Sequence, residues 1–163
     1  MNPTPLDKFS HWQKETPEAI FLRQPLNGIY REYSYAKAGT EICAIARSIQ
    51  ALNLPSRSNI AILSKNCAHW IMADLAIWTA GHVSVPLYPN LTASSVQQIL
   101  EHSESKAIFV GKLDDYESQR PGIPDSVQKV SFPLYGIDEG LQWDELLQTN
   151  SDALPTPHSW KDD

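Results

Sequence analysis

Residues 59–87 read NIAILSKNCAHWIMADLAIWTAGHVSVPL, and this stretch decides the fold class. It opens with an apolar run at 59–63 and continues into residues 67–80, which are apolar nearly all round. Gly81 ends that segment as a left-handed helix cap would, and a second apolar run follows at 82–87. A helix that joins two apolar runs through short links predicts a crossover between parallel strands buried on both faces.

The residues that follow repeat this alternation. A helix is expected to begin at Thr92 or Ser94, and residues 107–110 form a third apolar strand that ends at Gly111. We therefore expect an α/β layered domain with a mainly parallel sheet and flanking helices. Weaker patterns then predict a helical turn at 113–119, a strand at 127–132 and a short helix at 143–148.

The segment before residue 59 adds helices and a hairpin. Residues 5–15 place Leu6, Phe9 and Trp12 at spacings of three, which predicts an amphipathic helix. Residues 19–35 predict a β-hairpin that turns at Asn27-Gly28. Residues 35–53 carry a continuous apolar stripe and precede Pro55, so we expect a long helix there.

Composition narrows the class of protein. The chain has 163 residues, 42% hydrophobic residues and a net charge of −6, which gives no general reason to expect nucleic acid as a partner. No apolar run reaches the roughly 18 residues of a membrane span, and the N-terminus does not resemble a secretory signal. Two cysteines, Cys43 and Cys67, fall in helical patterns and suit reduced thiols. A cytoplasmic location is expected.

Charge divides the chain unevenly. Residues 1–111 carry a net charge of +1 and residues 112–163 carry −7, together with five of the 12 prolines. We expect a compact α/β region at about 35–111 and a looser acidic region at 112–163.

Motifs for common chemistries are absent from the sequence. There is no GxGxxG or GxxxxGK[ST] phosphate loop, no HxxxH or HExxH metal pair, and no GxSxG nucleophile motif around Ser84. Asp74 is the one acidic residue in an apolar helix, and we favour a structural hydrogen bond over a functional carboxylate. Local polar contacts are expected for His69, and partial burial with a hydrogen bond for His82. The carboxylate pairs Asp114-Asp115 and Asp162-Asp163 are expected to be solvated.

Three loops are expected at one edge of the sheet. They are Ser64-Lys65-Asn66, Pro86-Leu87-Tyr88-Pro89 and Gly111-Lys112, and each follows a predicted strand. Ligands of open parallel sheets bind beyond the carboxyl ends of the strands, so these loops could form a cleft wall. Stiff turns explain them equally well, since Pro86 and Pro89 restrict the backbone. Asn66 is expected to cap the helix that follows it.

Several of these segments together resemble the AMP-forming acyl-CoA synthetases, and most closely the long-chain fatty acid–CoA ligases. The resemblance covers residues 5–163 and is most specific at 60–115, where it is carried by SKNCAHW (64–70), ADLAIWTAGHVSVPLYP (73–89), ILEHSESK (99–106) and VGKLD (110–114). It implies an enzyme that forms an acyl-adenylate from a fatty acid and ATP with Mg²⁺, and then transfers the acyl group to coenzyme A. Peripheral membrane association of the full enzyme stays an open alternative.

The family's diagnostic motifs are not found in residues 1–163. The Ser/Thr/Gly-rich phosphate loop that ends in Pro-Lys-Gly would follow a segment like Trp160–Asp163, and the other nucleotide, metal and lysine motifs lie further on. The resemblance therefore assigns no catalytic, cofactor-binding or metal-binding residue to this chain. We expect an N-terminal part of the large domain, inactive by itself, whose partners are a fatty acid and the remainder of the chain.

Two other readings stay open. One is a free-standing flavodoxin-like binding or regulatory module, although a receiver-type version needs acidic residues where Ser64-Lys65-Asn66 follows the first parallel strand. The other is a homodimer formed through apolar surface that the remainder of the chain would cover.

Overall fold

A five-stranded parallel sheet forms the centre of the computed structural model, which describes residues 3–149. The strands lie in the order β4-β3-β5-β6-β7, and every neighbouring pair is parallel. Their bounds are β3 Asn59–Leu63, β4 Val83–Leu87, β5 Ala107–Val110, β6 Gln128–Ser131 and β7 Leu141–Gln142. The predicted α/β layer with a mainly parallel sheet is confirmed.

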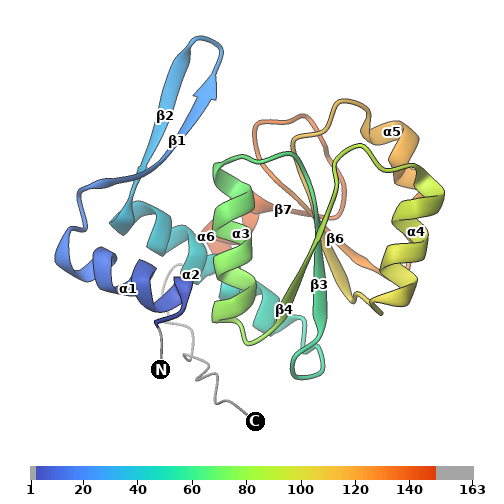
Figure 1. Ribbon diagram of the computed structural model, residues 1–163, viewed down its shortest axis with the longest axis horizontal. Helices are drawn as coiled ribbons and strands as arrows, with labels where there is room; N and C mark the ends of the chain where they lie inside the picture. The colour runs from blue at the N-terminus through green and yellow to red at the C-terminus, as the bar shows by residue number, and fades with distance from the viewer. Residues whose placement is uncertain (1–2, 150–163) are drawn as a thin grey trace.

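Helices cover both faces of this sheet (Figure 1). One face packs against α2 (Tyr35–Ala51), α3 (Ala68–Thr79) and α6 (Trp143–Thr149). The other face packs against α4 (Ala93–His102) and α5 (Tyr116–Gln119), which continues into the 3₁₀ turn η1 (Arg120–Gly122). Successive strand residues alternate between the two cores, because side chains along a strand point to opposite faces. In β3, for example, Ile60 and Ile62 enter the first core, and Ala61 and Leu63 enter the second.

The strand order creates a topological switch point. Counted along the chain, the five parallel strands lie in the order 2-1-3-4-5, which is the flavodoxin-like order. The chain leaves β3 toward one edge of the sheet and later returns to place β5 on the other side of β3. Loops on the two sides of such a point diverge, and the crevice between them is the usual ligand position in open α/β sheets.

Helix α3 ends as its sequence predicts but begins differently. Gly81 has φ +85°, which favours glycine, and the amides of Gly81 and His82 donate to the carbonyls of Trp78 and Ile77 in a Schellman cap. The prediction that Asn66 caps the helix is wrong. Cys67 occupies the N-cap position without a side-chain bond.

A residue distant in sequence supplies the missing partner at that helix end. The Gln24 side-chain oxygen accepts a hydrogen bond from the Ala68 amide at 2.9 Å, and Gln24 itself is buried. Because Gln24 lies on the N-terminal hairpin, this bond attaches the hairpin to the start of α3. No local sequence signal at residues 64–68 indicates such a cap.

The N-terminal hairpin stands apart from the central sheet (Figure 1). It comprises β1 (Ile20–Leu26) and β2 (Ile29–Ser34), which are antiparallel and turn at Asn27-Gly28 as predicted. At its base, the rings of Phe9, Phe21 and Tyr35 pack together with centroids 4.8–5.7 Å apart. Phe9 comes from α1 (Pro5–Glu15), so this cluster joins α1, the hairpin and α2.

Most predicted elements fall close to their observed bounds, and two elements were not predicted. The short strand β7 and the turn η1 carry no pattern of their own in the sequence. Beyond Gly111, where the sequence predicts a looser region, β6 and β7 extend the same sheet. Among the described residues, no helix has the length and apolar character that a bilayer crossing requires.

Candidate functional site

A cleft lies beyond the carboxyl ends of β3, β4 and β5, at the switch point of the sheet. Its volume is about 760 Å³. The three loops that the sequence placed at this edge do come together there. The lining residues are Ser64, Lys65, Asn66, Trp70, Pro86, Leu87, Tyr88, Pro89 and Lys112. The lining includes two lysines and no carboxylate, so the cleft favours an anionic ligand.

Hydrogen bonds of the backbone and of the Ser64 hydroxyl fix the two loops that flank the switch point. The Lys65 amide donates to the Lys112 carbonyl at 2.8 Å, and the Lys112 amide donates to the Ser64 hydroxyl oxygen at 2.9 Å. That hydroxyl donates in turn to the Lys65 carbonyl at 2.7 Å. The loops after β3 and β5 therefore hold each other, and both lysines project from one rigid unit.

Gly111 makes this close approach feasible. A Cβ atom at residue 111 would lie 2.1 Å from the Phe132 ring and 2.8 Å from the Ser64 hydroxyl oxygen. Any larger residue would push the loop after β5 away from Ser64, so glycine is required here for space.

The third loop is rigid for a different reason. Pro86 and Pro89 restrict the backbone on both sides of Tyr88, a residue that lines the cleft and is 77% exposed. From α5, the buried Gln119 amide nitrogen donates to the carbonyls of Pro89 and Leu91, each at 2.9 Å. An exposed aromatic ring on a fixed loop is a surface on which a planar ligand group can stack. The Gln119 contacts could not be expected from the sequence, because 30 residues separate it from Pro89.

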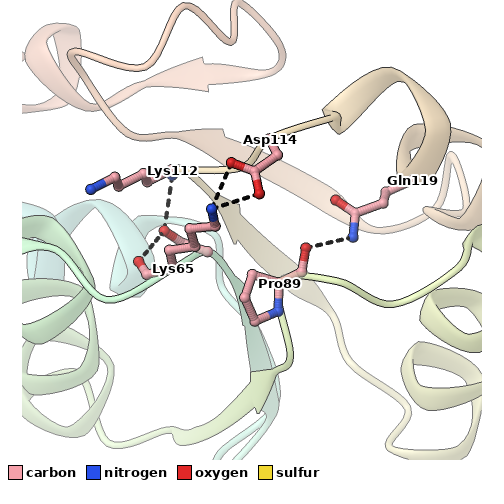
Figure 2. Close-up of polar contacts among 6 residues, drawn as sticks. Lys65, Pro89, Lys112, Asp114 and Gln119 are labelled. Carbon is pink, nitrogen blue, oxygen red and sulfur yellow. Dashed lines mark hydrogen bonds and ion pairs between the residues drawn. The ribbon is translucent and has the colours of Figure 1, made fainter.

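An ion pair links Lys65, a residue of the cleft lining, to the exposed Asp114 outside that lining (Figure 2). The Lys65 ammonium donates to both carboxylate oxygens of Asp114 at 2.6 Å. The Lys112 side chain extends away from this pair, and within residues 3–149 its ammonium makes no ion pair. As expected, Asp114 and Asp115 are both exposed, and each also has a polar partner: Asp114 binds Lys65, and Asp115 accepts a hydrogen bond from the Ser118 amide as the N-cap of α5.

Asp74 lies away from the cleft, where α3 packs on the edge strand β4. The Ser84 hydroxyl donates to its carboxylate at 2.5 Å, and the Trp78 indole nitrogen donates to the Ser84 oxygen at 3.2 Å. Burial raises the pKa of Asp74, and the bond from Ser84 opposes that shift. The predicted structural hydrogen bond is confirmed, and Ser84 acts as its donor.

His69 points into the first core and not toward the cleft. It is fully buried, and its Nε2 atom lies 3.3 Å from the Tyr33 hydroxyl on the hairpin. The expected local contact is therefore wrong, since the partner is 36 residues away. The rings of Phe132, Tyr135 and Trp143 surround it at 5.3–6.5 Å between centroids. Burial lowers the pKa of His69 to about 4, so the imidazole is neutral at pH 7.

The other sequence candidates form no catalytic group in the described part. His82 is buried just before β4, and Cys43 and Cys67 are both free thiols. Residues 3–149 contain no cluster of three or more His, Cys, Asp or Glu side chains placed to hold a metal ion. Asp162-Asp163 lie outside the described residues.

A second hollow lies at the opposite edge of the sheet. It has a volume of about 290 Å³ and is lined by Thr4, Pro5, Leu6, Trp78, His82 and Val83. Its surface is almost wholly apolar, and Val83 begins its strand there. Because it lies at the amino end of β4, it does not share the cleft's position at the switch point.

Long-chain fatty acid–CoA ligases are among the known proteins that this chain resembles in sequence. The chain is 27% identical over 101 residues to the long-chain-fatty-acid–CoA ligase FadD15 of Mycobacterium bovis, which covers 62% of this chain and 17% of that protein. It is 33% identical over 82 residues to the peroxisomal long chain acyl-CoA synthetase 6 of Arabidopsis thaliana, covering 50% and 12% respectively. The chain thus spans less than a fifth of these two relatives.

A solved structure shares the fold. Acetoacetyl-CoA synthetase from Streptomyces lividans superposes with a TM-score of 0.76 at 17% identity, over 93% of this chain and 25% of that chain. The sequence itself matches the AMP-binding enzyme family over residues 9–162. The chain therefore belongs to the AMP-binding enzymes, with long-chain fatty acid–CoA ligases among its homologues.

Proposed function

We propose that this chain is the N-terminal part of an AMP-forming long-chain fatty acid–CoA ligase. The reaction joins a fatty acid carboxylate to the α-phosphate of ATP and releases pyrophosphate. The coenzyme A thiol then takes the acyl group, and AMP leaves. The observation that carries the proposal is the similarity to long-chain ligases over half or more of the chain, within a confirmed AMP-binding family.

The cleft at the switch point supports a role in binding a phosphate-bearing co-substrate. ATP and coenzyme A both combine phosphates with a planar adenine, and the cleft combines Lys65 and Lys112 with the exposed ring of Tyr88. Ammonium groups hold phosphate oxygens by charge-assisted hydrogen bonds, and an aromatic ring can stack on a base. The lining holds no carboxylate, so it suits the phosphates and does not suit Mg²⁺.

Residues 1–163 contribute a rigid framework and positive charge for ligand binding, and they supply no group for the chemical steps. No catalytic residue is assigned to residues 1–163. The hydrogen bonds between the loops after β3 and β5 fix the backbone that carries the two lysines before a ligand arrives, which reduces the entropy lost on binding. A cytoplasmic location is part of the same proposal.

ATP–pyrophosphate exchange tests the proposed reaction. We expect no exchange from residues 1–163 alone. A protein that continues from Asp163 through the Pro-Lys-Gly phosphate loop should show exchange that depends on added fatty acid. Exchange by the 163-residue chain would contradict the proposal that residues 1–163 are inactive alone. A longer protein that activates no fatty acid would contradict the proposed substrate.

Lys112 tests the cleft within that longer protein. Lys112→Ala should raise the KM for ATP or for coenzyme A by about fivefold with little change in kcat, because one charge-assisted contact to a phosphate is lost. The matched control is Lys106→Ala, which removes an exposed lysine just before β5, at the opposite edge of the sheet. Measuring both KM values identifies the co-substrate, and equal KM values for both variants and wild type would exclude the cleft from binding.

Two earlier alternatives have clear tests. The flavodoxin-like strand order fits a ligand-binding or regulatory module as well as an enzyme, and fatty-acid-dependent exchange distinguishes the enzyme from the module.

Self-association through apolar surface also stays a prediction. Ile29 and Tyr30 at the hairpin are 70% and 66% exposed, and light scattering that finds a monomer at high concentration would contradict it.

A further inference from the structure

The ion pair between Lys65 and Asp114 makes the two lysines of the cleft lining different from each other. Lys65 is held by both carboxylate oxygens of Asp114, whereas the Lys112 ammonium has no ionic partner within residues 3–149. An anion that enters the cleft therefore meets one available ammonium and one that already has a carboxylate. The carboxylate also carries the same sign of charge as the anion.

The ion pair between Lys65 and Asp114 can break without disturbing the loops that carry it. The side chains of Lys65 and Asp114 are 41% and 82% exposed, and exposed ion pairs are weak because water and salt screen them. The loops that carry them are joined by hydrogen bonds of the Lys65 and Lys112 backbone and of the Ser64 hydroxyl, which involve neither charged group. Asp114 can therefore release Lys65 while the wall of the cleft stays in place.

We propose that Asp114 is a built-in competitor that sets the anion affinity of the cleft. Its carboxylate occupies the Lys65 ammonium, and a phosphate-bearing ligand must displace it before Lys65 and Lys112 bind the ligand together. This inference rests on the proposed role of the cleft in binding a phosphate-bearing co-substrate. Asp114 is a residue that tunes affinity and does not take part in the reaction.

Removal of the carboxylate charge should tighten anion binding. Asp114→Asn keeps the size of the side chain, frees the Lys65 ammonium and removes one negative charge beside Lys65. We expect roughly threefold to fivefold tighter binding at low salt, the size of effect that an exposed ion pair supports. Because both the pair and the repulsion are screened, the gain should shrink as salt rises toward 1 M.

Inorganic tripolyphosphate is the probe, and amide chemical shifts of the 163-residue chain report binding. The titration compares wild type with Asp114→Asn, Lys65→Ala, Lys112→Ala and the double variant of Asp114 and Lys65. Asp125→Asn is the matched control, since it removes the same charge before β6, at the opposite edge of the sheet. We expect Asp125→Asn to bind like wild type, each lysine variant to bind more weakly, and the gain from Asp114→Asn to be largely lost in the double variant.

The outcomes separate this inference from the proposed function. If neither lysine variant weakens binding, or no variant binds tripolyphosphate at the cleft amides, the proposed role of the cleft fails and the inference fails with it. If the lysine variants weaken binding but Asp114→Asn does not tighten it, only the role of Asp114 is overturned. A gain that is unchanged at high salt would also overturn it, because a loop rearrangement would then be the cause.

Discussion

Trp143→Ala should lower the free energy of unfolding of this chain by about 3–5 kcal/mol, the usual loss for a buried tryptophan. Trp143 begins α6, is 1% exposed, and lies 5.3–6.2 Å from the rings of His69, Phe109 and Phe132 between centroids. A loss of that size is a large share of the roughly 5–15 kcal/mol that stabilises a typical domain. Urea unfolding followed by circular dichroism measures it.

The Trp143 indole also donates a hydrogen bond to a buried carboxylate, and a second variant isolates the contribution of that bond. Its Nε1 atom donates to the Glu41 carboxylate at 3.1 Å, while burial raises the pKa of Glu41. Trp143→Phe keeps an apolar ring but removes the donor, so it should cost about 1–3 kcal/mol and raise the pKa of Glu41 further. A cost below 1 kcal/mol for Trp143→Ala would show that α6 does not pack as described.

The parts of the fold that the sequence predicts are those with local causes. The continuous apolar run at 59–63, the helix that ends at Gly81 and the Asn27-Gly28 turn each carry their own signal. The start of α3 does not, because its cap comes from Gln24, 44 residues earlier. Strand β7 has two residues and pairs only because β6 lies beside it, so no periodicity could identify it.

The candidate site likewise has features that the sequence predicts and features that depend on long-range contacts. The rule that ligands bind beyond the carboxyl ends of parallel strands brings the loops with Lys65, Pro86 and Lys112 to one edge, and the structure joins them in one cleft. Which side chains pair across that edge depends on the spacing of the loops in space. The bond between Lys65 and Asp114 is therefore visible only once β3 and β5 are side by side. His69 shows the same limit, because its position on an apolar helix does not reveal that the Tyr33 hydroxyl will contact it.

Acidification should destabilise the chain through His69. The folded state holds this imidazole neutral with a pKa of about 4, against the ordinary value of 6.5 that the unfolded chain provides. Below pH 6.5 the His69 imidazole of the unfolded chain binds a proton, whereas the buried imidazole of the folded chain stays neutral. The contribution of His69 to the free energy of unfolding is therefore complete above pH 6.5 and is lost progressively as the pH falls toward 4, up to about 3 kcal/mol in all. Urea unfolding at pH 7, 6 and 5 should show the decline.

A histidine variant separates this contribution from those of the carboxyl groups. His69→Phe retains a ring of similar size but cannot titrate, and it leaves the Tyr33 hydroxyl without its partner. We expect it to be less stable than wild type at pH 7 by about 1–3 kcal/mol and to lose less stability between pH 7 and 5. Burial raises the pKa values of Glu41 and Asp74, which favours the folded state at low pH, but both groups are present in each protein and cancel in the difference. Parallel pH profiles for the two proteins would mean that His69 is already accessible to protons in the folded state.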